Sequence, residues 1–87
     1  GDFGDCPECF EGLPISVIFD ARPLIDSGDT PMPKILKAMD DLKSGEVFEL
    51  LTPFYPAPII DTLRKKGYSS WSKKVAPDIV NTYFMRK

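Results

Sequence analysis

The residues with the clearest chemical potential are two cysteines near the start of the chain, Cys6 and Cys9, in the motif CPEC. A Cys-x-x-Cys pair can supply two ligands to a metal ion or form a small reversible disulfide. A structural zinc site or an iron–sulfur cluster needs four ligands, and this sequence has no other cysteine and no histidine. Besides incidental thiols, two hypotheses therefore stay open: a metal shared with ligands from outside the chain, and a thiol-relay or redox role.

The absence of histidine limits the remaining chemistry. It removes the commonest general base at neutral pH, and with it any hydrolytic triad or two-histidine zinc site formed by this chain alone. The neighbouring carboxylates Asp40 and Asp41 fall in a predicted helix, where adjacent side chains point apart, so they do not form a catalytic pair. The remaining chemistry must come from thiols, carboxylates, hydroxyls or lysines, and we favour a domain that binds over one that catalyses.

The second candidate site is a predicted helix start that contains two prolines. Thr30 comes directly before Pro31 and Pro33 in the segment TPMP, and an apolar helical pattern follows. Proline is tolerated in the first turn of a helix, because the N–H groups there have no intrahelical partner. The Thr30 hydroxyl is a suitable N-cap acceptor for one of these N–H groups. The pattern predicts a helix that begins within two residues of Pro31.

Free N–H groups at a helix start, together with nearby cations, can bind an anion. We expect this helix start to bind a small ligand or a protein partner, with Arg22 and Lys34 as its cations. For each of these two cations on its own, a local role is favoured: Arg22 pairs with an aspartate of its own loop, and Lys34 is a solvated helix residue. The candidate ligand-binding residues are Arg22, Thr30, Pro31, Met32, Pro33 and Lys34; the aspartates that Arg22 can pair with are Asp20, Asp26 and Asp29.

Four strands and two helices are expected to position these residues. Alternating or β-branched apolar segments predict strands at residues 15–20, 46–52, 68–75 and 79–86. The first predicted helix runs from Pro31 towards Gly45, and the second covers residues 57–66, with Gly67 as its stop. Residues 21–29 are rich in turn-forming residues and are expected to form a connection.

This order, β-α-β-α-β-β, predicts an α+β fold. Right-handed crossovers place both helices on one face of a mixed four-stranded sheet, and the last two strands form an antiparallel hairpin. The result is a two-layer α/β sandwich made by residues 14–87. Residues 1–13 have three glycines and no periodicity, so we expect a flexible arm that carries the Cys-x-x-Cys motif.

The composition is that of an ordinary globular protein, with 43% hydrophobic and 28% charged residues. No apolar run is long enough to cross a membrane, and no basic signal-peptide segment opens the chain, so we expect a cytoplasmic protein. A net charge of −2 does not favour nucleic-acid binding. The aromatic residues Phe54, Tyr55 and Trp71 are expected to pack in the core and hairpin, with an exposed patch for a partner as the alternative.

Over residues 15–86 the sequence resembles the TusA/SirA-like superfamily of sulfur carriers. The resemblance rests on a strand ending in Asp20, a proline-framed helix start, the turn LKSGE at residues 42–46, the Gly67–Tyr68 pair and the closing segment TYFMRK. The segments DARPL (20–24) and PFYPAP (53–58) are closest to a TusA-related branch of uncharacterised bacterial domains. The resemblance implies the TusA-like form of the sandwich described above.

The departure from the family pattern lies at Thr30. In the sulfur carriers a cysteine before the first proline holds the persulfide, and a hydroxyl cannot replace it. The resemblance therefore implies an uncharacterised accessory or binding domain rather than a sulfur carrier. Its expected ligand is a protein partner or a small anionic or sulfur-bearing molecule near the first helix start, with a role for Cys6 and Cys9 as the alternative.

Overall fold

The computed structural model describes residues 14–86, so Cys6, Cys9 and the rest of the predicted arm lie outside the described residues. The described part contains four strands and three helices. The strands are β1 (Ile15–Asp20), β2 (Val47–Thr52), β3 (Tyr68–Ala76) and β4 (Ile79–Arg86), and the helices are α1 (Arg22–Asp26), α2 (Met32–Asp40) and α3 (Ala57–Lys65).

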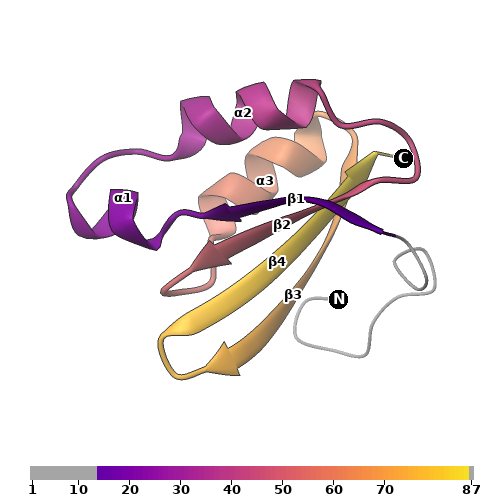
Figure 1. Cartoon of the computed structure of the whole chain (residues 1–87). Coiled ribbons are helices and arrows are strands. Elements are labelled where there is room, and N and C mark those ends of the chain that lie inside the picture. Colours follow the sequence, from indigo (N-terminus) through magenta and orange to yellow (C-terminus); the bar gives the residue numbers. More distant parts are fainter. Residues whose placement is uncertain (1–13, 87) are drawn as a thin grey trace.

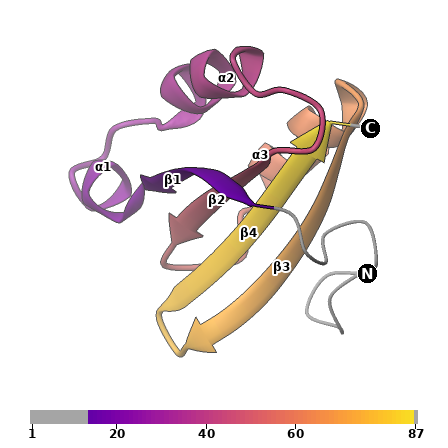
Figure 2. The ribbon, with the colours of Figure 1, turned by 45° about the vertical axis from the view of Figure 1, so that its right-hand side comes forward.

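The strands form one mixed sheet in the order β1-β2-β4-β3. β1 and β2 are parallel, and β4 lies antiparallel to both β2 and β3. The longer helices α2 and α3 cover the same face of the sheet, as Figures 1 and 2 show from two directions. The predicted two-layer α/β sandwich is therefore confirmed, and each predicted strand lies within one residue of its predicted bounds.

The core fills the space between the helices and the sheet. Phe48 of β2 lies at its centre, with ring centroids 6.2 Å from Phe19 and 6.4 Å from Phe84. On α2, Ile35 and Met39 are buried and lie four residues apart. They form the apolar stripe toward the sheet that the helical pattern predicts. The buried core residues are Ala21, Ile35, Met39, Leu42, Phe48, Leu50, Ile59, Ile60, Leu63, Tyr68 and Phe84.

The start of α2 differs in detail from the prediction. The helix begins at Met32, within the predicted two residues of Pro31, but Pro31 itself is the N-cap and no side chain caps the helix. The prediction that Thr30 is the N-cap is therefore wrong. The physical reason is that Pro31 already has helical backbone angles (φ −79°, ψ −10°), because its ring fixes φ near the helical value. This moves the boundary one residue past Thr30.

The short helix α1 is absent from the prediction, which has a connection over the same residues. It has only five residues and no fully buried side chain, so it carries too little periodicity to be detected. None of the described helices is long and apolar enough to cross a lipid bilayer.

Arg86 at the end of β4 holds the end of α2. Its guanidinium donates to the backbone oxygens of Leu42, Met39 and Asp40, the last two at 3.4 Å and 3.2 Å. It also lies 5.6 Å from the centroid of the Tyr68 ring, and the Tyr68 hydroxyl donates to the Met39 oxygen at 3.2 Å. These contacts reach carbonyl groups at and just after the end of α2, and they place a cation where the helix dipole favours one.

Candidate functional site

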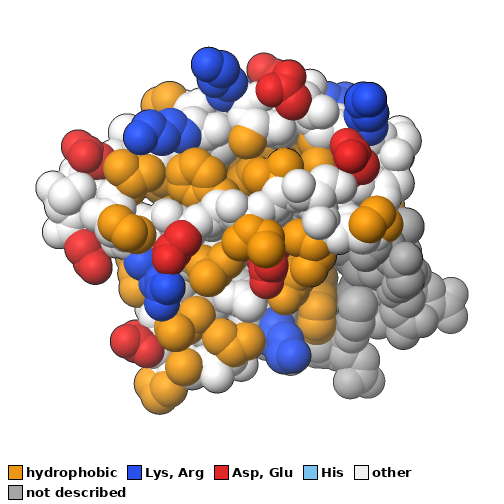
Figure 3. Space-filling view, viewed as in Figure 1, with side chains coloured by type: hydrophobic (Ala, Val, Ile, Leu, Met, Phe, Trp, Pro, Cys, Tyr) orange, Lys and Arg blue, Asp and Glu red, His pale blue; other side chains and the backbone are white. Residues whose placement is uncertain are grey.

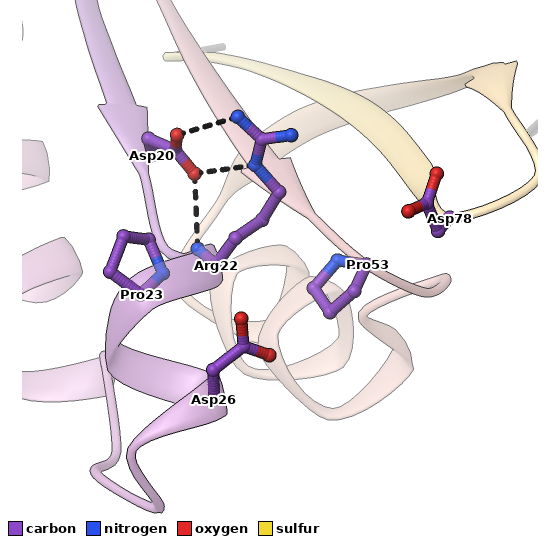
Figure 4. Close-up of a pocket in the computed structure, with 6 residues that line it drawn as sticks. All are labelled: Asp20, Arg22, Pro23, Asp26, Pro53 and Asp78. Carbon is purple, nitrogen blue, oxygen red and sulfur yellow. Dashed lines mark hydrogen bonds and ion pairs between the residues drawn. The ribbon is translucent and has the colours of Figure 1, made fainter.

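A cavity of about 580 Å³ opens where the parallel strands β1 and β2 end. Asp20 is the last residue of β1, Pro53 follows β2, and Asp78 lies in the turn between β3 and β4. The carboxyl ends of parallel strands are the usual position for a ligand in an open α/β sheet. We call this cavity the Arg22 pocket (Figure 4); the residues that line it are Asp20, Arg22, Pro23, Asp26, Pro53 and Asp78.

Arg22 is held inside the pocket by Asp20. The Arg22 Nε donates to Asp20 Oδ1 at 2.9 Å and its Nη2 donates to Oδ2 at 2.8 Å, while the Arg22 backbone N–H donates to Oδ1 at 3.1 Å. Two parallel bonds between the planar groups fix the guanidinium in both position and orientation. The structure therefore shows the local ion pair that the sequence favours for Arg22.

The ion pair changes the protonation of Asp20. The hydrogen bonds from the Arg22 side chain hold the pKa of Asp20 below its usual value, against a smaller opposing effect of desolvation. The same pair raises the pKa of Arg22, and the charges of Asp78 and Asp26 raise it further. Both of these carboxylates therefore lie close enough to the guanidinium to interact with it electrostatically.

The pocket has an excess of negative charge. Its described lining contains one arginine and three aspartates. One of these aspartates, Asp20, forms the ion pair with the arginine. Asp26 and Asp78 are exposed, and within residues 14–86 neither forms an ion pair. The described carboxylates also form no group of three that could hold a metal ion. The excess of carboxylates favours the approach of a cation to this cavity over that of an anion.

The start of α2 offers fewer donors than an ordinary helix start. Pro31 and Pro33 carry no N–H, and the N–H of Ile35 already donates to the Pro31 oxygen at 3.0 Å. Only the N–H groups of Met32 and Lys34 therefore face outward in the first turn. Thr30, Pro33 and Lys34 are exposed, Met32 is half-buried and Pro31 is buried.

Among the residues that the sequence groups at the first helix start, one lines the cavity described above. Arg22 lines the Arg22 pocket, and Thr30, Pro31, Met32, Pro33 and Lys34 are not among the residues that line it. Asp78, which the predicted site lacks, reaches the pocket from the β3–β4 turn. No local signal in the sequence marks it, because more than fifty residues separate it from Asp20.

The sheet face away from α2 and α3 carries a second group of polar and aromatic side chains. Glu49 Oε1 accepts hydrogen bonds from Asn81 Nδ2 and from the Tyr83 hydroxyl, both at 3.1 Å. The Trp71 ring stacks on Tyr83, with centroids 5.4 Å apart, so Trp71 packs in the hairpin as sequence analysis expects. In Figure 3, apolar side chains lie over the strands between scattered acidic and basic ones.

Comparison with protein families gives one match, to a family described as "Uncharacterized conserved protein (DUF2249)", over residues 18–83. The chain belongs to the DUF2249 family. The matched part of this DUF2249 domain runs from β1 into β4 and includes all six residues of the Arg22 pocket. Comparison with curated proteins and with solved structures finds no match. The TusA/SirA-like relationship stays a prediction, because the family description names no such relative.

Proposed function

We propose that this DUF2249 domain is a non-enzymatic binding domain that binds a protein partner by accepting a lysine or arginine side chain of that partner in the Arg22 pocket. The observation that carries the proposal is the charge of the pocket. Asp26 and Asp78 face a cavity in which Arg22, the only cation that the described residues contribute, is already paired with Asp20. A cation from outside is the group that this arrangement attracts.

The walls of the pocket suit a long basic side chain. The rings of Pro23 and Pro53 present apolar surface to the cavity, and the aliphatic stem of a lysine or arginine packs well on such surface while its charged end stays hydrated. Asp26 lies on α1 and Asp78 in the β3–β4 turn, so the charged end would lie between two separate elements. The fixed guanidinium of Arg22 would orient the partner by donating to one of its backbone carbonyl groups.

The anionic ligand expected from the sequence fits the Arg22 pocket poorly, because the two uncompensated carboxylates would repel it. The start of α2, with Lys34 and the free N–H groups of Met32 and Lys34, is the remaining place for an anionic or sulfur-bearing ligand. That hypothesis stays a prediction. The hypotheses of a metal or thiol role for Cys6 and Cys9 also stay predictions.

The proposal is tested by nuclear magnetic resonance titration of the isotope-labelled full chain with two blocked tripeptides, acetyl-Gly-Arg-Gly-amide and acetyl-Gly-Glu-Gly-amide. The arginine peptide is expected to shift the amide signals of residues 20–26 and of Asp78, and the glutamate peptide is not. Titration with inorganic phosphate and with thiosulfate tests the start of α2, where the Met32 and Lys34 amides report binding.

The double variant Asp26→Asn, Asp78→Asn is expected to weaken the response to the arginine peptide by about tenfold or more, which corresponds to the loss of one or two charge-assisted hydrogen bonds. The matched control is Asp40→Asn, Asp61→Asn, which changes the net charge equally at exposed helix positions. An equal response to both peptides, or a response to the arginine peptide that survives in the pocket variant, would refute the proposal.

A further inference from the structure

The two edges of the sheet differ in how they are protected against pairing with another strand. The β3 edge carries Lys73 and Lys74 and has an irregularity between Lys74 and Ala76. Charged residues and bulges are the usual means of blocking an edge. The β1 edge reads ISVIFD and has no charged residue before Asp20. Its irregularity lies near its start, between Ile15 and Val17, so residues 17–20 pair regularly with β2.

The exposed side of β1 has backbone groups available for a further strand. The N–H of Ala21 donates to the Leu51 oxygen at 3.0 Å, and the side on which a residue forms its hydrogen bonds alternates along a strand. The N–H and C=O groups of Ile18 and Asp20 therefore point away from β2. The Ile18 side chain is also 66% exposed, the largest exposed fraction of any large apolar residue in the described part of the chain.

This edge leads directly into the Arg22 pocket, because Asp20 both ends β1 and lines the cavity. A strand added to β1 would therefore place one of its side chains beside Asp20, at the rim of this negatively charged cavity. The chain's own residues 1–13 contain four acidic residues and no basic one, so they carry no suitable charge. In a second copy paired antiparallel about Ile18, the residue opposite Asp20 would be Ser16, which carries no charge either.

We infer that the partner binds as an extended segment, adding a strand antiparallel to β1 and placing a basic side chain in the Arg22 pocket. The inference rests on the proposed function and specifies the form of the partner. Across the pair, an apolar residue of the partner lies opposite Ile18 and the basic residue lies opposite Asp20. Because the partner runs antiparallel, its sequence reads basic, any residue, apolar. Backbone hydrogen bonds give affinity and these two side chains give specificity.

The test is selection of peptides from a library of random dodecapeptides displayed on phage, with the full chain as the immobilised target. The enriched peptides are then synthesised, and their affinities are measured by isothermal titration calorimetry. We expect enriched peptides to contain the pattern of a lysine or arginine two residues before a β-branched or aromatic residue, and to bind with a one-to-one stoichiometry.

Two variants of Ile18 probe the edge. Ile18→Lys places on β1 the kind of charge that blocks pairing at the β3 edge. Ile18→Pro removes the outward N–H of residue 18 and leaves the hydrogen bonds between β1 and β2 intact. Each is expected to weaken peptide binding by about tenfold or more, the effect of losing a hydrogen bond and its supporting contact. The matched control is Val75→Lys, which replaces another β-branched residue, 47% exposed, on the opposite edge strand; binding should change by less than about twofold.

The outcomes separate this inference from the proposed function. If the affinity for basic peptides depends on Asp26 and Asp78 but not on Ile18, strand addition is overturned and the pocket remains the binding site. Peptides that depend on neither would overturn both, and so would a failure to enrich any peptide. A dimer of the full chain that light scattering detects and that Ile18→Lys dissociates would assign the edge to a second copy and overturn the inference.

Discussion

At the scale of single residues, the pairing of Arg22 determines what the candidate site can bind. The sequence allows two roles for Arg22, and it favours a local ion pair over anion binding at the first helix start. The structure has the local pair, with two side-chain bonds of 2.8–2.9 Å to Asp20. A two-residue spacing between a strand end and a helix start makes this pair geometrically simple, which is why the sequence could predict it.

The Asp20–Arg22 pair predicts a specific dependence of stability on pH. The pKa of Asp20 is lower in the folded chain than its usual value, so its stabilising effect is fully present above the unfolded pKa of about 3.9 and is lost as the pH falls through the folded pKa. The Asp20→Asn variant should therefore lose less stability than the parent chain below about pH 4. Because the two side chains are 40% and 36% exposed, the difference should be small.

Thermal unfolding of both proteins from about pH 2 to pH 7 measures this effect. Asp61→Asn is the control, because Asp61 is an exposed residue of α3. Parallel stability curves for Asp20→Asn and the parent chain in the acid range would contradict the assignment.

The buried hydroxyl pair of Ser72 and Thr82 makes a second prediction at this scale. Their oxygens lie 2.9 Å apart, and both side chains are fully buried. Thr82→Val alone leaves the Ser72 hydroxyl without this partner and should cost about 1–3 kcal/mol of unfolding free energy. The double variant Ser72→Ala, Thr82→Val removes both hydroxyls and should cost less than the sum of the single variants. Urea denaturation of all four proteins completes the cycle, and strict additivity would contradict the pairing.

At the scale of elements, the sequence predicts the strands and long helices better than their ends. The alternation of apolar residues in β4 and the apolar stripe of α2 are strong patterns, because each repeats over two or more turns or pleats. The exact start of α2 depends on whether Thr30 or Pro31 is the N-cap. The periodicity of the apolar residues does not contain that information. The five-residue helix α1 is shorter than the window in which periodicity can be recognised.

The contact between β4 and α2 predicts that Arg86 stabilises the sandwich. Arg86→Met removes the bonds to the final carbonyl groups of α2 and should lower the unfolding free energy by about 1–2 kcal/mol. In a domain of this size each kcal/mol lowers the melting temperature by about 4–8 °C. Arg86→Lys keeps the charge but loses the fork of donors, so it should recover only part of the loss.

Calorimetric melting of the Arg86 variants measures these effects, and Lys73→Met, at an exposed position of β3, is the control for loss of a charge. Equal melting temperatures for Arg86→Met and Lys73→Met would show that Arg86 does not hold the end of α2.

At the scale of the whole molecule, the fold can be predicted from the sequence and the candidate site can be predicted only in part. Local patterns and the right-handed crossover rule suffice for the two-layer sandwich. The Arg22 pocket instead depends on how far the β3–β4 hairpin extends past the end of β2, which places Asp78 across the cavity from Asp20 (Figure 4). Such a long-range approach leaves no periodic signal in the sequence. The pairing of Arg22 with Asp20 could therefore be predicted, but the position of Asp78 could not.

If the charge of the Arg22 pocket selects a basic partner, reversal of that charge should reverse the selection. The measurement is the ratio of the dissociation constants for the blocked arginine and glutamate tripeptides, in the parent chain and in the double variant Asp26→Lys, Asp78→Lys. The parent chain should prefer the arginine peptide, and the variant should prefer the glutamate peptide, because its pocket then holds three cations and one carboxylate. An unchanged preference in a folded variant would contradict the claim.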